Sequence, residues 1–510
     1  MVLKHNESQN NTGQMAMVNY KDELINYSTS STSLTSYSLS TSTSSLPFIY
    51  VTDDINSSKS TKNPVKLKVK KQYDIEITGE NHAGFPLFFQ NNINTIFIPK
   101  NIKTHLGKFV PKEYLKNIDR DKNIAIEKCL VFVSNLSSTV YSDDRWKSLS
   151  STQIHEQTKK GNDNTFIYTH IIKALTYKSN IKVAVIMVKK NEYGYETYQE
   201  GIACKEYSLT DTYFNGSLVE YIIKDKGIIQ KRNKFFYSQL KKAVDSTIGN
   251  NLIDLYSKIE LPSHAEINLE AKRLTKLKYR TKKGKTLTFL NKHPRSYYKD
   301  ANSRSFVEQN IKLFDYLTKR GFMIPIIGKE KSGGRIVDSF TLMPSWIRRL
   351  VKIDGKPIIE VDYSALHPNI AMSIYGGSKK NLTHLEVAEN SKIDLSDVKI
   401  AHLSYFNERV HGMKCSPLYS YYSESEIAMN EAIIKEKQMS LKGHKTTSMR
   451  MFAKEVEIMT ECIKQLNYKG ICVGYIYDAL FCKESDAKLV EEIMNKVVLE
   501  HSVYTTAKIG

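Results

Sequence analysis

The clearest pattern of apolar and polar positions lies in the last third of the chain. Residues 358–361, Ile-Ile-Glu-Val, are mostly apolar and are typical of a buried strand. From Ser448 to Leu466 apolar residues recur every three or four positions, which predicts an amphipathic helix packed under a sheet. The run from Gly470 to Lys483 is apolar around Asp478 in its middle, so it predicts two strands that flank a tight turn. A further amphipathic helix is expected from Ser485 to Val498.

A second pattern, earlier in the chain, predicts a helix followed by a strand pair. Ile167 to Leu175 has helical spacing and precedes three strand-like segments, namely Ile181 to Val188, Tyr193 to Tyr198 and Ile202 to Leu209. Trp146 and the run after it could supply an earlier helix. Residues 141–235 therefore resemble the winged-helix domains of plasmid and phage replication proteins, and an ordinary α+β domain is the alternative.

These patterns divide the 510 residues into an α+β multidomain chain. Residues 1–65 contain a Ser, Thr and Tyr tract that cannot bury enough apolar surface, so a disordered tail is expected. Residues 66–140 alternate in short pieces and predict a small β-containing subdomain. Residues 236–330 are expected to be mostly helical, and residues 331–510 to form antiparallel strands backed by helices.

The charge of the chain indicates a polyanionic partner. Lysine and arginine outnumber the acids 74 to 54, which gives a net charge of +20 and favours nucleic acid. Basic and aromatic residues are interleaved within residues 236–330, a mixture that suits a surface following a phosphate backbone. A solvated basic face is the alternative. The basic candidates for nucleic-acid binding are Lys272, Arg273, Lys276, Lys278, Arg280, Lys282, Lys283 and Lys285.

The cysteines and the apolar runs bear on the compartment. The six cysteines show no CxxC spacing, so neither a zinc knuckle nor a disulfide framework is indicated. The most apolar run, Val183 to Val188, is too short to cross a bilayer. We therefore expect an intracellular, cytoplasmic protein in a reducing environment, without a membrane partner.

Asp362 and Asp478 are the candidates for chemistry. Asp362 ends the apolar run at 358–361, where its carboxylate and the Tyr363 carbonyl could face a hard cation. Asp478 lies inside an apolar run, where a charge requires a partner or a metal ion. The alternatives are a helix N-cap for Asp362 and an ordinary hairpin-turn aspartate for Asp478.

The residues around these two aspartates carry a family resemblance. Asp-Tyr-Ser-Ala-Leu-His at 362–367 resembles motif A of the family A nucleic-acid polymerases, and Tyr477-Asp478-Ala479 resembles their motif C. The segment with Gly333-Gly334-Arg335 and Arg348-Arg349 is similar to phage and plasmid proteins with a polymerase A-like palm. The resemblance covers about residues 330–505. It implies a polymerase palm with a fingers insertion at about 377–446, and the basic region 236–330 in the place of a thumb.

The resemblance also implies roles for particular residues. Asp362 and Asp478 would hold two Mg²⁺ ions, and Lys399 would bind the incoming triphosphate, with Arg335 and Arg348 as lesser candidates. His367 stands where the family has its sugar-facing glutamate, although a packed core histidine is the alternative. The chain departs from the family pattern at two positions. One is His367, and the other is Ala479 of motif C, which replaces the usual second acid.

The function expected from this resemblance is template-directed nucleic-acid polymerisation in the replication of a phage, plasmid or other mobile element. Synthesis of DNA is favoured over synthesis of RNA. Template, primer and nucleoside triphosphates would be the partners. The alternative is a DNA-binding protein of replication initiation or regulation with a degenerate palm. The partial match around Lys399 keeps that alternative open.

Overall fold

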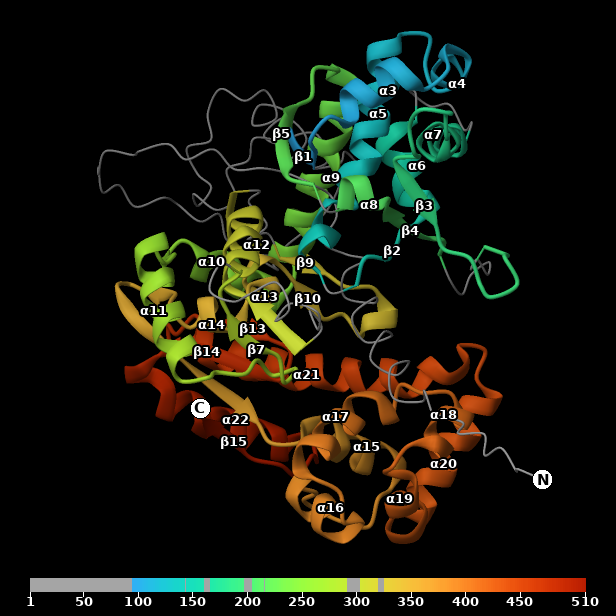
Figure 1. The fold of residues 1–510 in the computed structure, drawn as a ribbon. Helices are drawn as coiled ribbons and strands as arrows, with labels where there is room; N and C mark the ends of the chain where they lie inside the picture. Colours follow the sequence, from blue (N-terminus) through green and yellow to red (C-terminus); the bar gives the residue numbers. More distant parts are fainter. Residues whose placement is uncertain are drawn as a thin grey trace, which may run out of the picture.

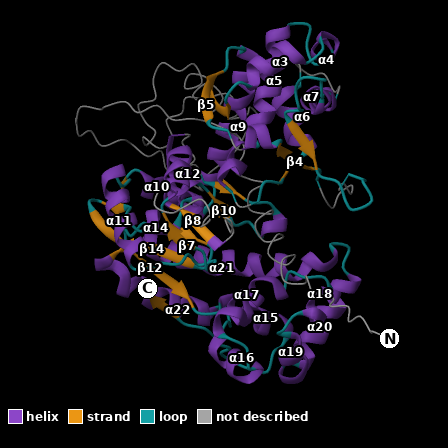
Figure 2. Cartoon of the chain, viewed as in Figure 1, coloured by secondary structure: helices purple, strands orange, loops and turns teal. Residues whose placement is uncertain are grey.

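A computed structural model describes residues 94–142, 144–159, 166–196, 204–214, 216–290, 303–319 and 325–510. The tail predicted over residues 1–65 and the first part of the subdomain predicted over residues 66–140 lie outside these ranges. Within them the protein mixes helices with several small sheets (Figure 2). Each sheet is antiparallel except the parallel pair β7–β8.

Buried apolar side chains form two large cores rather than four. The first core runs from Ile96 to Ile228 and the second from Leu240 to Ala507. The boundary predicted at residues 140 and 141 falls inside the first core, and the one at residues 330 and 331 falls inside the second. Helices from either side of each boundary bury their apolar faces together, so neither boundary separates two cores.

The first core is built from helices and two small sheets. Strands β1 (Thr95–Pro99) and β5 (Leu218–Ile222) pair with each other. A second sheet has the order β2-β4-β3, formed by β2 (Lys147–Ser148), β3 (Ile186–Val188) and β4 (Glu206–Leu209). The helices are α3 (Ile102–Phe109), α4 (Lys112–Lys116), α5 (Lys122–Ser134), α6 (Ser151–Thr158), α7 (Ile167–Thr176) and α8 (Asp211–Phe214).

The sequence patterns of this region are confirmed for its helix and only in part for its strands. The helix expected from Ile167 to Leu175 is α7, and its apolar positions Ile167, Ile171 and Leu175 are buried. The strands expected at 181–188 and 202–209 are shorter but do pair with each other. The described residues 193–196 form a turn with one isolated bridge instead of a strand.

Residues 226–348, most of which belong to the second core, are mostly helical in the part that the structure describes, as expected for residues 236–330. Helix α11 begins with a capping box, in which Ser263 and Glu266 satisfy each other's backbone N–H groups. The helices are α9 (Lys226–Val244), α10 (Thr247–Tyr256), α11 (His264–Lys276), α12 (Val307–Lys319), α13 (Ser339–Leu342) and α14 (Ser345–Arg348). Two short sheets are β7 (Thr286–Thr288) with β8 (Arg304–Phe306), and β9 (Ile326–Ile327) with β10 (Ile336–Val337).

The largest sheet has six strands and is centred on β12. Its order is β13-β14-β12-β11-β6, and β15 also pairs with β12. Its strands are β6 (Ile259–Glu260), β11 (Lys352–Ile353), β12 (Lys356–Tyr363), β13 (Gly474–Ile476), β14 (Ala479–Lys483) and β15 (Ala507–Ile509). The strand and the hairpin predicted from the apolar runs are therefore confirmed as β12 and as β13–β14.

Helices cover one face of this sheet. Side chains alternate along β12, so Val361 and Tyr363 point to one face, and Glu360 and Asp362 to the other. Tyr363 is buried and donates its hydroxyl to the Met494 carbonyl of α22, 2.6 Å away, which marks the covered face. The covering helices are α21 (Thr446–Tyr468) and α22 (Ala487–Glu500), close to the predicted bounds.

Between β12 and α21 the chain forms a helical insertion. After α15 (Leu366–Tyr375) come α16 (His384–Ser391), α17 (Leu395–Tyr405), α18 (Val410–Cys415), α19 (Tyr419–Ser425) and α20 (Ile427–Met439). In Figure 1 these helices gather at the end of the molecule opposite α3, α4 and α7. None of the helices in the described ranges has the length and apolar character needed to cross a membrane.

Candidate active site

The two predicted aspartates come together at the centre of the large sheet. Asp362 is the next-to-last residue of β12 and lies opposite Ala479 of β14, and Asp478 lies in the two-residue turn that joins β13 to β14. The Tyr363 N–H donates to the Asp478 carbonyl across 3.3 Å, which ties the end of β12 to this turn. Tyr477 takes a positive φ of 57°, so the backbone turns sharply just before Asp478.

Burial and a nearby negative charge make each of the two carboxylates hard to ionise. Burial, and then the charge of Asp478, raise the pKa of Asp362 to about 8. Burial, and then the charge of Glu455, raise the pKa of Asp478. The Oδ1 atom of Asp362 is buried without a hydrogen-bond partner. Two coupled carboxylates with an unpartnered oxygen are the arrangement that a bound cation would stabilise.

The donor set fits Mg²⁺ better than a transition metal. Among the residues that the structure describes, no three His, Cys, Asp or Glu side chains are grouped so that they could hold a metal ion. Mg²⁺ is often held by one or two carboxylates, with waters and substrate phosphates completing its shell. The Tyr363 hydroxyl donates to the Met494 carbonyl. Of the two Tyr363 oxygens, the backbone carbonyl is therefore the one that could bind Mg²⁺ together with Asp362 and Asp478.

A stability measurement would test this electrostatic account. The raised pKa of Asp362 lies above its unfolded value of about 3.9, so the native state keeps the proton longer than the unfolded chain does. Without metal, wild-type stability should therefore fall as pH rises from about 4 to about 8. Asp362→Asn should reduce this fall, to which the raised pKa of Asp478 still contributes, and should give a higher Tm than wild type at pH 8 in EDTA. Mg²⁺ should raise the Tm of the wild type only. Parallel pH profiles in EDTA would contradict the account.

A buried charge network lies directly behind the turn of Asp478. The Arg335 guanidinium donates to both carboxylate oxygens of Glu455, at 2.8 and 2.5 Å, and His367 Nε2 is 2.7 Å from Glu455 Oε2. Burial raises the pKa of Glu455, but Arg335 and then His367 outweigh it and lower the pKa to about 2. Arg335 lies between two rings, 3.6 Å from the centroid of Phe452 and 4.8 Å from that of Tyr477.

This network changes the roles predicted for two residues. Arg335 is only 2% exposed, so its guanidinium is committed to Glu455 rather than presented to a triphosphate. His367 is neither a simple core residue nor an open sugar contact, because Glu455 and Arg335 both contact its Nε2. Glu455 is not among the residues predicted from the sequence. Its signal is a lone acid within the apolar stripe of α21, between Phe452 and Met459.

Arg348, the other arginine predicted to bind the triphosphate, is a structural residue here. Its guanidinium donates to the Phe340 and Thr341 carbonyls at 3.0 and 3.1 Å, at the end of α13. The side chain is buried and lies over the Phe481 ring, 5.4 Å from the centroid. These groups occupy and enclose the guanidinium, and the contact between Arg348 and the triphosphate stays a prediction.

Lys399 remains exposed on α17 of the helical insertion. Burial, and then the charges of Lys399 and His367, lower the pKa of His384 to about 4. Lys399 of α17 and His367 of α15 therefore both lie close enough to the His384 imidazole to lower its pKa. His384 Nδ1 is 3.0 Å from His402 Nδ1, and His402 Nε2 is 2.7 Å from the Tyr422 hydroxyl. The insertion therefore borders the helix that follows Asp362.

The basic candidates divide between a helix and a turn. Lys272, Arg273 and Lys276 are exposed on α11, although Arg273 pairs with Glu270. Lys278 and Arg280 follow the helix, and Lys282, Lys283 and Lys285 lie in the turn that leads to β7. Lys282 Nζ is 3.3 Å from Glu360 Oε1, and its charge lowers the pKa of Asp362. This turn therefore borders the face of β12 that carries Glu360 and Asp362.

Solved structures match this chain, and one of them is a polymerase domain. No family model and no curated protein matches this chain. The structure is the POL domain of Pol1 from M. smegmatis in complex with DNA primer-template and dNTP. It is similar to this chain at 9% identity and a TM-score of 0.34, over 56% of this chain and 73% of that one. A similarity this low supports no argument, so the case for function rests on the site itself.

Proposed function

We propose that this chain is a template-directed nucleic-acid polymerase with a palm centred on β12 and the β13–β14 hairpin. The observation that carries the proposal is the pair Asp362 and Asp478. Asp362 lies on β12 and Asp478 in the turn that leads into the neighbouring antiparallel strand β14, both pKa values are raised, and Asp362 Oδ1 has no partner. Two such carboxylates at one sheet position fit a site for two divalent cations that neutralise phosphates.

The proposed reaction is nucleotidyl transfer. The 3′-hydroxyl of a primer attacks the α-phosphorus of a nucleoside triphosphate; the bond to pyrophosphate breaks, and the hydroxyl proton leaves. Asp362 and Asp478, with the Tyr363 carbonyl, would hold Mg²⁺. Two bound Mg²⁺ ions would supply Lewis-acid stabilisation of the developing charge and a lower pKa for the attacking hydroxyl. Lys399, exposed on α17, would bind the triphosphate by charge-assisted hydrogen bonds.

The buried network has a supporting part in this proposal. Arg335 stacks on Tyr477 and is held by Glu455, so it restrains the turn that presents Asp478. The same network keeps a third carboxylate, Glu455, ionised beside Asp478. Arg335 and His367 would therefore position Asp478 rather than contact the nucleotide directly.

Primer extension by the purified chain tests the proposal. The assay needs a labelled primer annealed to a longer template, Mg²⁺, and deoxyribonucleotides or ribonucleotides in separate reactions. We expect elongated product with deoxyribonucleotides, dependent on template sequence and abolished by EDTA. Absence of product with either set, while the primer-template is bound, would overturn the proposal and favour the DNA-binding initiator as the function.

The basic turn gives a prediction about nucleic-acid binding. Replacing Lys282, Lys283 and Lys285 with alanine should remove up to about three phosphate contacts, each contributing roughly 0.9 to the slope of log affinity against log salt. The slope for a primer-template should become shallower by about two to three, which anisotropy titrations at several salt concentrations would measure. The control is Lys464, Lys488 and Lys496→Ala, because these exposed lysines lie on α21 and α22, which cover the other face of the sheet. Equal slopes in both triple variants would contradict the assignment.

A further inference from the structure

Two outer strands of the large sheet lie next to the candidate metal site, and each is held by an asparagine side chain. Strand β13 is the end strand of the sheet and leads into the turn of Asp478. Strand β15 pairs with β12 at Asp362. The free edge of an outer strand presents backbone N–H and C=O groups that need partners. Helices α10 and α22 each supply an amide to one of these edges.

Asn251 of α10 holds the free edge beside β13. Its Nδ2 donates to the Val473 carbonyl across 2.6 Å, and its Oδ1 accepts from the Val473 N–H across 3.0 Å. One side chain thus satisfies both backbone groups of a residue, as a neighbouring strand would. Both residues are buried, and Val473 directly precedes β13. Asn251 is therefore an edge brace, a side chain in the place of a strand, on the segment that leads to Asp478.

Asn495 of α22 is the second edge brace, and it holds β15. Its Oδ1 accepts from the Ala507 N–H across 2.7 Å, and its Nδ2 donates to the Ala507 carbonyl across 3.3 Å. The next residue, Lys508, is the one that pairs with Asp362. Helix α22 also packs against β12. The helix therefore fixes the end of β12 and the strand beside it together.

The two edge braces bear on the separation of the two carboxylates. The charge of Asp478 raises the pKa of Asp362, so the ionised pair is repulsive and a movable strand would let it separate. The pairing of β12 with β14 fixes the acids relative to each other from the inside of the sheet. The braces hold the strands on either side of that pair from the outside. Groups behind metal ligands commonly orient those ligands in this way.

We propose that Asn251 and Asn495 are positioning residues of the candidate active site. They keep β13 and β15 in place, so that Asp478 and Asp362 retain the separation needed to share divalent cations. This inference rests on the proposed function, which gives the two acids their metal-binding role. Neither asparagine would touch the metal or the nucleotide, since each acts through the backbone of one strand. The alternative is a role in covering sheet edges alone, which affects stability but not Mg²⁺ affinity.

The test measures Mg²⁺ binding by the folded full chain through the rise in Tm, which requires no activity. The Mg²⁺ concentration that gives half of the rise is compared between variants. Asn495→Ala and Asn251→Ala should each increase this concentration about tenfold, because losing a group that orients a metal ligand typically costs 10–100-fold in metal affinity. Asn495→Asp keeps the acceptor for the Ala507 N–H and should stay within about threefold of wild type. If Asn251→Ala does not fold, the two variants of Asn495 decide the inference.

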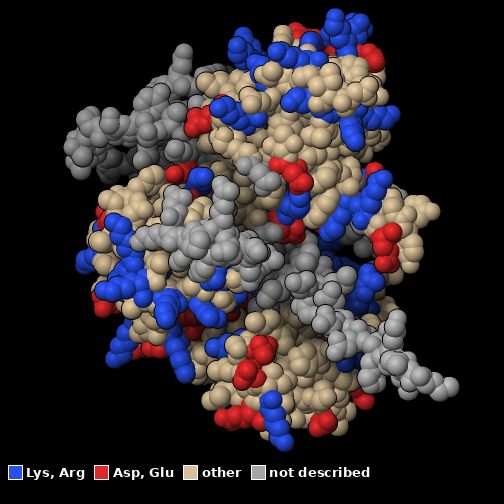
Figure 3. Space-filling view, in the orientation of Figure 1, with Lys and Arg blue, Asp and Glu red and all other residues tan. Residues whose placement is uncertain are grey.

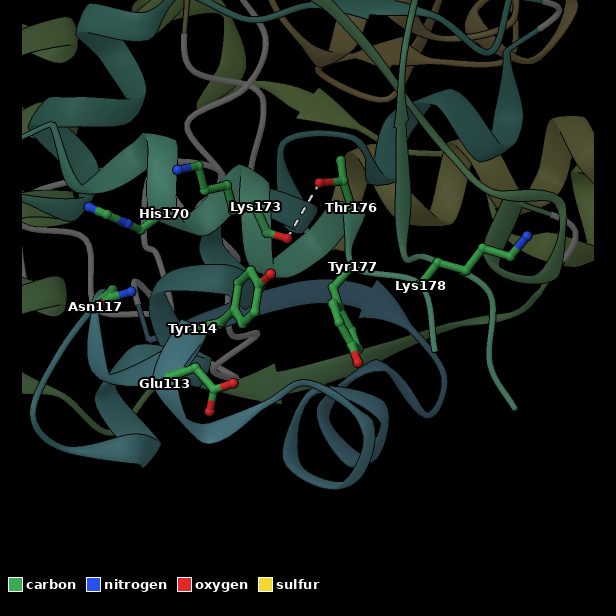
Figure 4. Close-up of a pocket in the computed structure, with 8 residues that line it drawn as sticks. All are labelled: Glu113, Tyr114, Asn117, His170, Lys173, Thr176, Tyr177 and Lys178. Atoms are coloured by element: carbon green, nitrogen blue, oxygen red, sulfur yellow. Dashed lines mark hydrogen bonds between the residues drawn. The ribbon is translucent and has the colours of Figure 1, made fainter. Parts of the chain in front are cut away.

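Primer extension and nucleic-acid binding supply two further readouts. The Mg²⁺ concentration for half-maximal extension, measured well below the Tm of each variant, should increase in parallel with the concentration from Tm. Neither brace belongs to α11, over which Figure 3 shows Lys and Arg side chains gathered, so affinity for primer-template in EDTA should be unchanged. The matched control is Asn117→Ala. Asn117, labelled in Figure 4, is exposed and lines a groove of the first core, so this variant should match wild type throughout.

The outcomes separate this inference from the proposed function. A lower Tm in EDTA with an unchanged Mg²⁺ dependence would overturn the inference alone, because the asparagines would then only stabilise the sheet. Weaker primer-template binding with an unchanged Mg²⁺ dependence would overturn it as well. A wild-type chain that neither gains Tm with Mg²⁺ nor extends a primer would overturn the proposed function and this inference with it.

Discussion

Asp362→Asn and Asp478→Asn should each abolish nucleotide incorporation while leaving the chain folded. Each substitution removes one of the two charges that would hold the cations, and neither side chain supports the core through a large apolar surface. The expected loss in kcat for primer extension is at least about a thousandfold, or roughly 4 kcal/mol of barrier. Rapid-quench primer extension at saturating nucleotide measures it.

The matched control for these variants is Asp354→Asn. Asp354 lies on the same sheet, in the turn before β12, where it is exposed and pairs with Lys483 across 3.3 Å. This variant carries the same charge change and should retain activity within about twofold of wild type. If either active-site variant keeps activity within about tenfold of wild type, roughly 1.4 kcal/mol, the two aspartates do not form the catalytic pair.

Arg335→Met should destabilise the fold by about 3–5 kcal/mol, because it leaves the buried Glu455 carboxylate without its main partner. Combining it with Glu455→Gln should restore a large part of this loss, since the second change removes the unpaired charge. Urea unfolding followed by the fluorescence of Trp346, which is buried in the same core, measures both. A Trp146→Phe background isolates that signal, since the chain has two tryptophans.

An exposed ion pair provides the comparison for this experiment. Arg450 Nη1 lies 2.6 Å from Glu436 Oε1, and about half of the Arg450 side chain is exposed. Arg450→Met should therefore cost no more than about 1 kcal/mol. If Arg335→Met costs as little as Arg450→Met, the buried network does not stabilise the second core. Restraint of the turn at Asp478 would then need another source.

Local apolar patterns predict individual strands and helices, but not which distant elements pack together. The strand before Asp362, the hairpin around Asp478 and the helix ending near Leu466 each depend on apolar periodicity within about twenty residues, and each is present. The boundaries between domains are set instead by which distant helices share a core. Periodicity contains no information on that, so residues 94–140 were separated from residues 141–228 although they pack together.

The charged residues show the same division between local and distant information. A sequence marks Arg335 and Arg348 as cations near motif A but not what surrounds them. The partner of Arg335, Glu455, is 120 positions away. Arg348 is enclosed by carbonyls of the preceding helix, α13. Glu455 was missed for the converse reason, because an acid in an apolar stripe is recognisable only once its cationic partner is known.

The pairing of β12 has a consequence for synthesis of the chain on the ribosome. Asp362 pairs with Ala479 of β14 on one side and with Lys508 of β15 on the other, and Lys508 lies 146 residues after Asp362. At roughly 5–20 residues per second, translation of that stretch takes roughly 7–30 s. Throughout this interval the nascent strand offers unpaired backbone edges, the condition under which strands associate with the wrong chain. Expression yield should therefore respond more strongly to chaperones that act during translation than to those that act after release.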